Sequence, residues 1–333
     1  MPLSGVVGHA RLTALISRAI ERDTLPPTLL FAGPSGVGKW LVARATAEAV
    51  NCLEPTHPVD ACGQCRSCDR IARGVHVDVI ALEPDDRASI KIDVVREALS
   101  RTGYKPFEGK RRVVLIREAD TLETAAQNAL LKALEEPPPG TMFILTTAVP
   151  GALLTTVRSR CMALRFGRLT AAEVATILMR DHDHSEADAR DAAPLADGSV
   201  GQALGLSDRD VGDLRDSAMR LLQHASGHAD TQARIQAAAA LVAGPAKKER
   251  TRDDLAMVLR VTASMLRDIE AINAGADPRV LAHPQLSGDL SSLARAYAGE
   301  RARTAFGAVD RALMALERNA GTKVVAEWLA VQL

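Results

Sequence analysis

The sequence predicts an α/β fold followed by an all-helical remainder, and three observations indicate this class. Short, uninterrupted apolar runs alternate with helical patterns over roughly residues 1–167, as in a doubly wound parallel sheet. A glycine-rich loop joins the first of these runs to a helix. After residue 168 the strand signal disappears, and Ala, Leu and Arg recur in helical rhythm.

Five apolar runs are the predicted strands. Each is short and unbroken, which is typical of strands buried on both faces of a parallel sheet. They cover residues 28–32, 77–82, 112–117, 142–146 and 162–166. Helices are expected at 11–22, 39–50 and 121–135, and Asp120 with Glu123 predicts a capping box before the last of them. The helical remainder is expected to form a small domain over 168–207 and a larger one over 208–333.

Bulk composition favours a globular protein without a strong electrostatic signature. Lys plus Arg and Asp plus Glu both total 41, so no basic nucleic-acid footprint is visible in the net charge. Any contact with DNA must therefore be local or supplied by partners. The N-terminus lacks the pattern of a signal peptide, and no apolar run approaches 18 residues, so we expect a cytoplasmic protein that does not span a membrane.

The glycine-rich loop, GPSGVGK at 33–39, has the pattern of a phosphate-binding loop. Gly33, Gly36 and Gly38 let backbone N–H groups wrap a phosphate, and the helix that follows adds the positive end of its dipole. Ser35 lies within the loop, and Lys39 is placed to reach the outer phosphates of ATP or ADP.

Two residues depart from the pattern of an active site. A working loop has Ser or Thr after the lysine as a Mg²⁺ ligand, whereas Trp40 stands here. The strand at 112–117 should end in Asp-Glu, but Arg117 takes the Asp position and only Glu118 matches. A cation at 117 repels Mg²⁺. The chain is therefore not expected to hydrolyse ATP; the loop either binds nucleotide weakly or binds none.

Four cysteines form a compact motif with the spacing C-x9-C-x2-C-x2-C, namely Cys52, Cys62, Cys65 and Cys68. In a cytosolic protein this spacing predicts a closed, structural Zn²⁺ site with four thiolate ligands. An iron–sulfur cluster and unmetallated thiols are the alternatives, and His57 or His76 are alternative ligands to one of the sulfurs.

Several segments resemble the bacterial clamp-loader AAA+ subunits of DNA polymerase III. They are IKIDVVREAL at 90–99, ADTLETAAQNALLKALEEPP at 119–138, TTVRSRC at 155–161 and the cysteine motif inserted after the loop helix. The resemblance implies a RecA-like nucleotide-binding domain over 1–167 with a zinc module at 52–68. It also implies a helical lid over 168–207 and a helical collar domain for oligomerisation over 208–333.

Two kinds of subunit share these features in that family, the ATP-hydrolysing motor (gamma/tau) and the delta-prime subunit. Trp40 and Arg117 favour the delta-prime type, as does Gly201, which stands where motor subunits carry an arginine that contacts ATP. Arg160 in Ser159-Arg160-Cys161 matches the arginine that the family inserts into the ATP site of a neighbouring subunit.

The resemblance implies a non-hydrolysing part of a DNA polymerase holoenzyme. Its partners would be the gamma/tau motor subunits and the delta subunit, and through the complex the sliding clamp and primer–template DNA. The chain would help to load the clamp onto primed DNA and lend Arg160 to an adjacent ATPase site. The alternative is a gamma/tau-type motor subunit.

Overall fold

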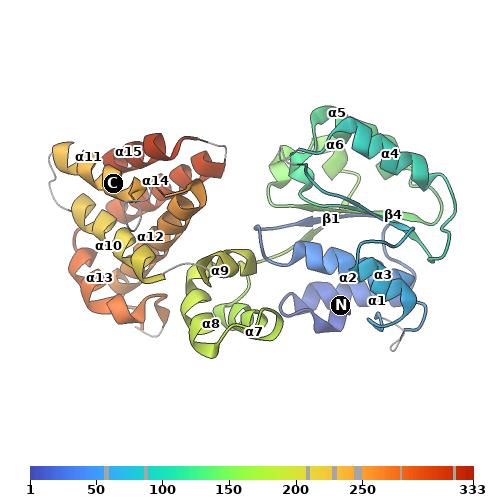
Figure 1. Cartoon of the computed structure of the whole chain (residues 1–333), viewed down its shortest axis with the longest axis horizontal. Coiled ribbons are helices and arrows are strands. Elements are labelled where there is room, and N and C mark those ends of the chain that lie inside the picture. The colour runs from blue at the N-terminus through green and yellow to red at the C-terminus, as the bar shows by residue number, and fades with distance from the viewer. Residues whose placement is uncertain are drawn as a thin grey trace. The chain divides into compact units, whose positions relative to one another are not determined.

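The computed structural model describes residues 1–55, 60–85, 89–207, 211–226, 231–243, 250–277, 280–317 and 320–333. It divides into two compact units (Figure 1). Unit 1 comprises Met1–Ile177 and Gly198–Gly201, and unit 2 comprises Leu178–Asp197 and Gln202–Leu333. The domain boundaries expected at 167 and 207 remain predictions.

Unit 1 contains a five-stranded parallel sheet with the strand order β2-β3-β4-β1-β5. Its strands are β1 (Thr28–Ala32), β2 (Val79–Leu82), β3 (Arg112–Ile116), β4 (Thr141–Thr147) and β5 (Met162–Arg165). Every strand pair is parallel; Leu30 of β1, for example, lies between Leu145 of β4 and Ala163 of β5. The five predicted strands and their parallel arrangement are confirmed.

Helices cover both faces of this sheet, as Figure 1 shows. The helices are α1 (Ala10–Glu21), α2 (Lys39–Asn51), α3 (Arg66–Ala72), α4 (Ile92–Thr102), α5 (Thr124–Glu135) and α6 (Thr155–Arg158). Alternate residues of β1 enter two separate cores, because side chains alternate across a strand. Phe31 packs with α1, α2 and α3 on one face, and Leu30 packs with α4 and α5 on the other.

The expectation that every strand is buried on both faces is wrong for the two edge strands. The side chains of β3 and β4 are buried throughout, whereas exposed residues occur in β2 and dominate β5. An edge strand has a neighbour on one side only, so the flanking helices cover its faces less completely. A run of apolar residues in the sequence does not distinguish a central strand from an edge strand.

The predicted capping box at Asp120 and Glu123 is also wrong. Glu123 is the N-cap of α5 but makes no side-chain capping bond. Asp120 instead accepts hydrogen bonds from Thr147 Oγ1 at 2.6 Å and from Ala148 N at 3.2 Å. Its carboxylate therefore joins the end of β3 to the end of β4 across the sheet.

Unit 2 is helical in its described part, as the sequence predicts. Two helices, α7 (Ala171–Asp181) and α9 (Val200–Ser207), begin in unit 1 and end in unit 2. The other helices are α8 (Glu186–Ala192), α10 (Val211–Ser226), α11 (Thr231–Val242), α12 (Arg252–Asn273), α13 (Ser287–Ala294), α14 (Glu300–Glu317) and α15 (Thr322–Gln332). Within the described residues, no helix combines the length and hydropathy that crossing a membrane requires.

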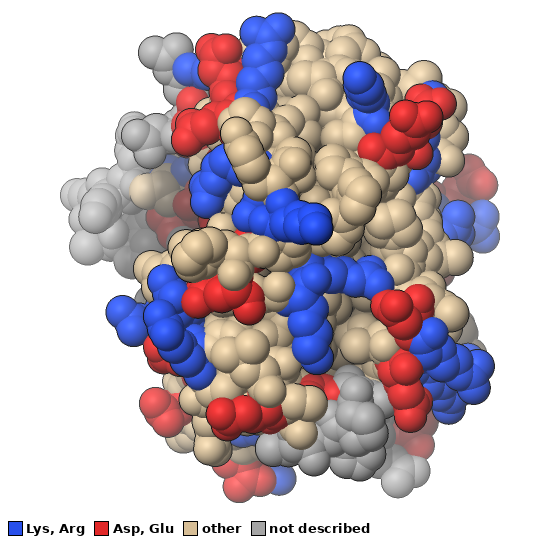
Figure 2. All heavy atoms as spheres, turned by 90° about the vertical axis from the view of Figure 1, so that its right-hand side faces the viewer, with Lys and Arg blue, Asp and Glu red and all other residues tan. Residues whose placement is uncertain are grey.

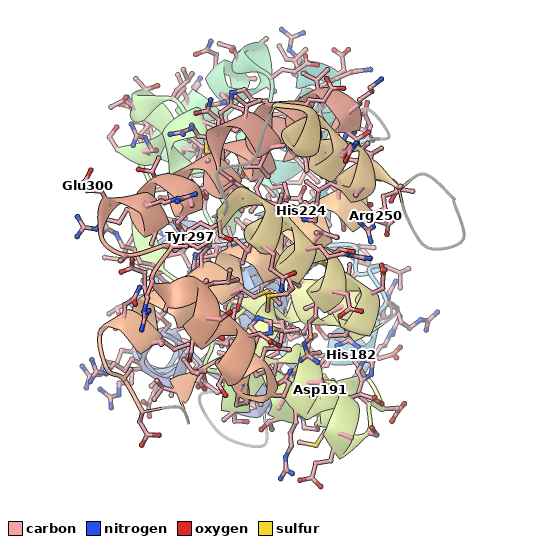
Figure 3. All side chains as sticks on the ribbon, turned by 90° about the vertical axis from the view of Figure 1, so that its left-hand side faces the viewer. His182, Asp191, His224, Arg250, Tyr297 and Glu300 are labelled. Atoms are coloured by element: carbon pink, nitrogen blue, oxygen red, sulfur yellow. The ribbon has the colours of Figure 1, made fainter. Side chains whose placement is uncertain are left out.

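Two buried polar side chains fasten the helices of unit 2, and both are labelled in Figure 3. Arg250 donates to Asp213 Oδ2 at 2.8 Å, to Ser217 Oγ at 2.7 Å and to the Leu241 carbonyl at 3.1 Å. It thereby joins α10, the end of α11 and the start of α12. The hydroxyl of Tyr297 donates to the Leu222 carbonyl at 3.0 Å, and burial raises its pKa to about 12.

A buried ion pair anchors the entrance to the sheet in unit 1. Asp78, fully buried before β2, pairs with Arg112 at 2.7 Å and accepts backbone N–H bonds from Phe107, Glu108 and Gly109. Burial alone would raise the pKa of Asp78, but these donors outweigh it and bring the pKa to about 2.

We expect Asp78→Asn to lower the free energy of unfolding by about 3–5 kcal/mol, because the buried Arg112 charge loses its partner. Because the folded pKa of Asp78 is depressed, its contribution is complete above the unfolded pKa near pH 4. It is lost as the pH falls toward 2, and amounts to roughly 2–3 kcal/mol. Urea denaturation at neutral and acidic pH measures both effects. Asp69→Asn, which removes an exposed pair with Arg73, is the control and should change little. Equal effects of the two variants would contradict this assignment.

Candidate functional site

The glycine-rich loop lies between the end of β1 and the start of α2, as predicted. Gly36 and Gly38 both have positive φ, at 72° and 95°, a conformation that glycine adopts without strain. Gly33 has no room for a side chain, since a Cβ there would lie 2.3 Å from the Phe166 carbonyl oxygen. These glycines thus place the loop against the carboxyl edge of the sheet, where nucleotides bind in folds of this class.

Lys39 is the first residue of α2 and its side chain is buried in the loop. Its Nζ donates to the carbonyl oxygens of Gly33 at 2.7 Å and Pro34 at 2.6 Å. Burial lowers the pKa of Lys39, an effect opposed by the nearby carboxylates of Asp120 and Glu118. The ammonium group of Lys39 therefore forms hydrogen bonds within the loop. To bind a phosphate, it would have to break its hydrogen bonds to the Gly33 and Pro34 carbonyls.

The start of α9 closes over Gly36. Val200 N donates to the Gly36 carbonyl at 2.9 Å, and a Cβ on Gly36 would lie 2.1 Å from Ser199 Oγ. Gly201, at the position where the sequence predicts a missing ATP-contacting arginine, lies directly against the loop. Gly201 therefore lies next to the loop within unit 1, but it offers no side chain to a ligand.

The two residues that depart from the nucleotide-binding motif, Trp40 and Arg117, lie next to each other. The guanidinium carbon of Arg117 lies 5.9 Å from the centre of the Trp40 ring, within cation–π range. Arg117 also pairs with Glu83 at 2.9 Å and with Glu118 at 3.5 Å. Trp40 is half-buried and packs against the core that contains Phe31. An indole and a guanidinium thus take the place of a hydroxyl and a carboxylate.

Glu118 follows β3 in a left-handed conformation, with φ of 49°. Its backbone N–H donates to Thr146 Oγ1 at 3.3 Å, and its carboxylate is exposed beside Arg117. A carboxylate that polarises water needs a free oxygen directed at the reacting phosphate. The ion pair with Arg117 competes for that oxygen.

Arg160 lies just before β5, on the surface of unit 1. Its Nη2 and Nε donate to one oxygen of Glu135 at 2.7 and 3.0 Å, and its Nη1 donates to the Thr156 carbonyl. The side chain of Arg160 is 30% exposed and that of Glu135 is 59% exposed. The backbone oxygen of Arg160 accepts a hydrogen bond from Thr28 Oγ1 at 2.7 Å. The guanidinium is therefore held at the surface by side-chain contacts, while the backbone is anchored to β1.

The four cysteines of the predicted metal site converge. Their Sγ atoms all lie within 4.8 Å of one another. Cys52 Sγ is 3.9 Å from Cys65 Sγ, and Cys62 Sγ is 4.0 Å from Cys68 Sγ. A tetrahedral ion with metal–sulfur bonds of about 2.3 Å needs sulfurs about 3.8 Å apart. The geometry therefore fits one tetrahedral metal ion.

Backbone donors around the sulfurs also favour thiolates. Cys62 N donates to Cys52 Sγ at 3.3 Å, and Cys65 N donates to Cys62 Sγ at 3.1 Å. Burial raises the pKa of Cys52, although the backbone hydrogen bonds act to lower it. A bound cation would favour the deprotonated thiolate. His76 is no ligand, because its ring nitrogens bond to Ser67 Oγ and Asp78 N. His57 lies outside the described residues.

Two contacts at these sites cannot be predicted from local sequence patterns. His9 reaches the glycine-rich loop, with Nε2 2.9 Å from the Val37 carbonyl oxygen, and its ring packs edge-on against Phe166. Glu135 is the last residue of a predicted helix, and its sequence position gives no indication that it pairs with Arg160. Both contacts join segments that are far apart in the chain, so no local sequence pattern predicts them.

Comparison with known proteins gives related subunits. Residues 8–170 match the family described as "DNA polymerase III, delta subunit". The chain is 34% identical over 213 residues to the DNA polymerase III subunit tau/gamma of Haemophilus influenzae, covering 62% of this chain and 30% of that protein. It is 36% identical over 176 residues to the gamma/tau subunit of Mycobacterium tuberculosis, covering 53% and 30%.

The aligned region is thus about 30% of the length of these relatives. A crystal structure of a DNA polymerase III gamma subunit-related protein from Thermotoga maritima covers 96% of this chain and 97% of its own, at 17% identity and a TM-score of 0.46. The family match spans the segment that carries the loop, the cysteines and Arg160. The segment that carries these sites, residues 8–170, belongs to the family of bacterial DNA polymerase III clamp-loader subunits.

Proposed function

We propose that this chain is the delta-prime-type subunit of a DNA polymerase III clamp loader, which helps to load the sliding clamp onto primed DNA without hydrolysing ATP itself. One observation carries the proposal. Trp40 and Arg117 stand at the two positions of the metal ligands, and the guanidinium carbon of Arg117 lies 5.9 Å from the centre of the Trp40 ring. Neither side chain ligates a hard cation such as Mg²⁺.

The surroundings of this pair support the same conclusion. Lys39 is engaged by loop carbonyls, and Arg117 competes for the carboxylate of Glu118. Phosphoryl transfer depends on electrostatic stabilisation by the metal and the lysine, and losing such terms costs orders of magnitude in rate. In this proposal Gly33, Ser35, Gly36, Gly38, Lys39 and Glu118 form a degenerate site that binds ATP or ADP weakly or not at all.

We therefore expect no ATP turnover by the purified chain, and no change in clamp loading by a complex that carries Lys39→Ala. Phosphate release by the isolated chain measures the first, and clamp loading by the reconstituted complex measures the second. The double variant Trp40→Thr, Arg117→Asp restores both types of ligand and tests whether they alone limit metal binding. Turnover by the unaltered chain that Lys39→Ala abolishes would refute the proposal.

The second candidate is an ATP-hydrolysing motor subunit of the gamma/tau type. The names of the related proteins favour it, since those proteins are gamma/tau subunits with 34–36% identity. The turnover experiment separates the two candidates directly, because a motor subunit needs its own metal site and a delta-prime-type subunit does not.

Arg160 is the residue that we propose to act in a neighbouring subunit. It is held at the surface by Glu135, an ion pair between partly exposed groups that contributes only about 0–1 kcal/mol. Phosphate oxygens of a nucleotide on an adjacent subunit would readily replace that carboxylate, since they accept the same planar fork of donors. The proposed partners are the gamma/tau motor subunits and delta, with the clamp and primer–template DNA reached through the complex.

For the cysteine site we propose zinc. Four sulfurs with tetrahedral spacing and N–H donors suit a closed Zn²⁺ site, which leaves no position for a substrate. Its role would be structural, since α3 carries Ile71 into the core of unit 1.

A further inference from the structure

Two aromatic side chains stand out on the loop between α4 and β3, residues 103–111. Tyr104 is 75% exposed and Phe107 is 83% exposed, the largest values among the exposed large hydrophobic side chains of the described residues. The whole chain has only five Phe, two Tyr and two Trp. Exposing two of these nine within four residues forgoes burial that the core would otherwise use. Such exposure is typical of a binding surface.

This loop is held in a fixed conformation. The buried carboxylate of Asp78 accepts the N–H groups of Phe107, Glu108 and Gly109 at 2.8–2.9 Å. Arg112 donates to the carbonyls of Tyr104 at 3.0 Å and Lys105 at 3.3 Å. The aromatic rings therefore project from an anchored backbone, and a ligand would bind without first ordering the loop.

The charges around the rings are positive. Glu108 is paired with Arg70 at 2.8 Å, and Asp23 is paired with Arg111 at 2.5 Å.

Three further cations, Arg101, Lys105 and Lys110, are exposed, and none of them forms an ion pair with a carboxylate in the described part of the chain. Figure 2 views unit 1 from the right-hand side of Figure 1; basic side chains lie in the middle of that face, with acidic side chains among and around them. Because Glu108 and Asp23 are paired and these three cations have no carboxylate partner among the described residues, the loop attracts anions, although the chain as a whole has no net charge. The side chain of Arg101 donates to the Val77 carbonyl at 3.3 Å.

We propose that the loop at 103–111 binds single-stranded nucleic acid. Bases stack on Tyr104 and Phe107, while Arg101, Lys105 and Lys110 contact the phosphates. Exposed aromatic faces interleaved with cations are the combination that single strands require, because unpaired bases offer flat faces and the backbone offers charge. A duplex hides its base faces and fits this surface less well. An apolar protein partner would leave the three cations without counter-charges.

A cleft next to the loop extends the surface. Its volume is about 750 Å³, and its charged lining residues are Lys110, Arg111, Glu21 and Asp23, the last of which is paired with Arg111. Lys110 therefore belongs both to the loop and to this cleft.

The proposal is independent of whether the chain hydrolyses ATP or supplies Arg160 to a neighbour. It is tested with the full chain and a fluorescently labelled oligothymidylate, by anisotropy at several salt concentrations. The variant Tyr104→Ala, Phe107→Ala should weaken binding at least about fivefold without changing the slope of log K against log salt. The variant Lys105→Ala, Lys110→Ala should weaken binding and also reduce that slope by about 1.4, or 0.7 for each lost phosphate contact.

Matched controls lie in unit 2, where Phe306 and Lys323 are also exposed. Phe306→Ala and Lys323→Ala should bind the oligonucleotide as the unaltered chain does. Circular dichroism checks that the loop variants, which keep Asp78 and Arg112, remain folded. Absence of binding near 50 mM salt, or equal weakening by loop and control variants, would overturn the proposal. Loop-dependent binding of an acidic aromatic peptide in place of the oligonucleotide would overturn it in favour of a protein partner.

Discussion

A clamp-loader complex that carries Arg160→Ala should assemble normally but hydrolyse ATP more slowly when clamp and DNA are present. An arginine supplied by a neighbouring subunit contributes 10³–10⁵ in rate at the site that it serves in other nucleotide hydrolases. Because a ring with several active sites would lose the arginine at one of them, the fall in total turnover should be smaller. Steady-state phosphate release by the reconstituted complex measures it.

The structure indicates that this variant will fold. The side chain of Arg160 lies at the surface, and the hydrogen bond that anchors this position to Thr28 uses the backbone oxygen, which alanine retains. Arg160→Lys should restore activity only in part, because an ammonium lacks the planar fork. Glu135→Gln should leave turnover close to normal, since the pair that it disrupts is weak.

Arg158 provides the matched control. It is exposed two residues earlier, and its Nη2 bonds only within its own helix, to Thr155 Oγ1 at 3.3 Å. Arg158→Ala should leave turnover unchanged. If the Arg158 complex loses activity while the Arg160 complex loads clamps at the normal rate, the arginine has been assigned to the wrong residue.

Removing the metal should unfold the cysteine module while the parallel sheet remains folded. Structural zinc contributes about 10–16 kcal/mol to the folding of small zinc-finger peptides, so the module is not expected to keep its fold without the ion. We expect about one zinc per chain as purified, and loss of it in Cys65→Ser. Elemental analysis measures the metal, and limited proteolysis between residues 52 and 72 detects unfolding of the module.

The consequences should extend to the N-terminus of the chain. Asp60, beside the cysteines, accepts the N–H groups of Leu3 and Ser4 at 2.8 and 2.9 Å, and Leu3 is buried. Cys161→Ser is the control, because Cys161 is buried next to β5 and outside the cluster; it should retain the zinc. Less than a few tenths of an equivalent of zinc in the unaltered protein, with four freely titratable thiols, would contradict the prediction.

Local patterns in the sequence were enough to locate the sheet, the loop and the cysteine cluster. Unbroken apolar runs predict strands of five to seven residues such as β1 and β4, because a strand that is buried on both faces contains mainly apolar residues. The loop can be located from its glycines, two of which have positive φ in the structure. The cysteine cluster can be located because its spacing is typical of the ligands of one metal ion. The departures at Trp40 and Arg117 can also be seen in the sequence, since each residue stands at a defined place in a motif; the loss of metal binding that they imply remains a prediction.

Only the tertiary structure brought distant residues together. Trp40 and Arg117 lie on different elements, and their contact depends on the end of β3 meeting the start of α2. Glu135 meets Arg160 because α5 and the segment before β5 lie side by side. Phe107 is anchored by Asp78, which precedes β2, and Tyr104 is anchored by Arg112 of β3. Such contacts arise from packing between segments far apart in the chain, which periodicity and spacing do not encode.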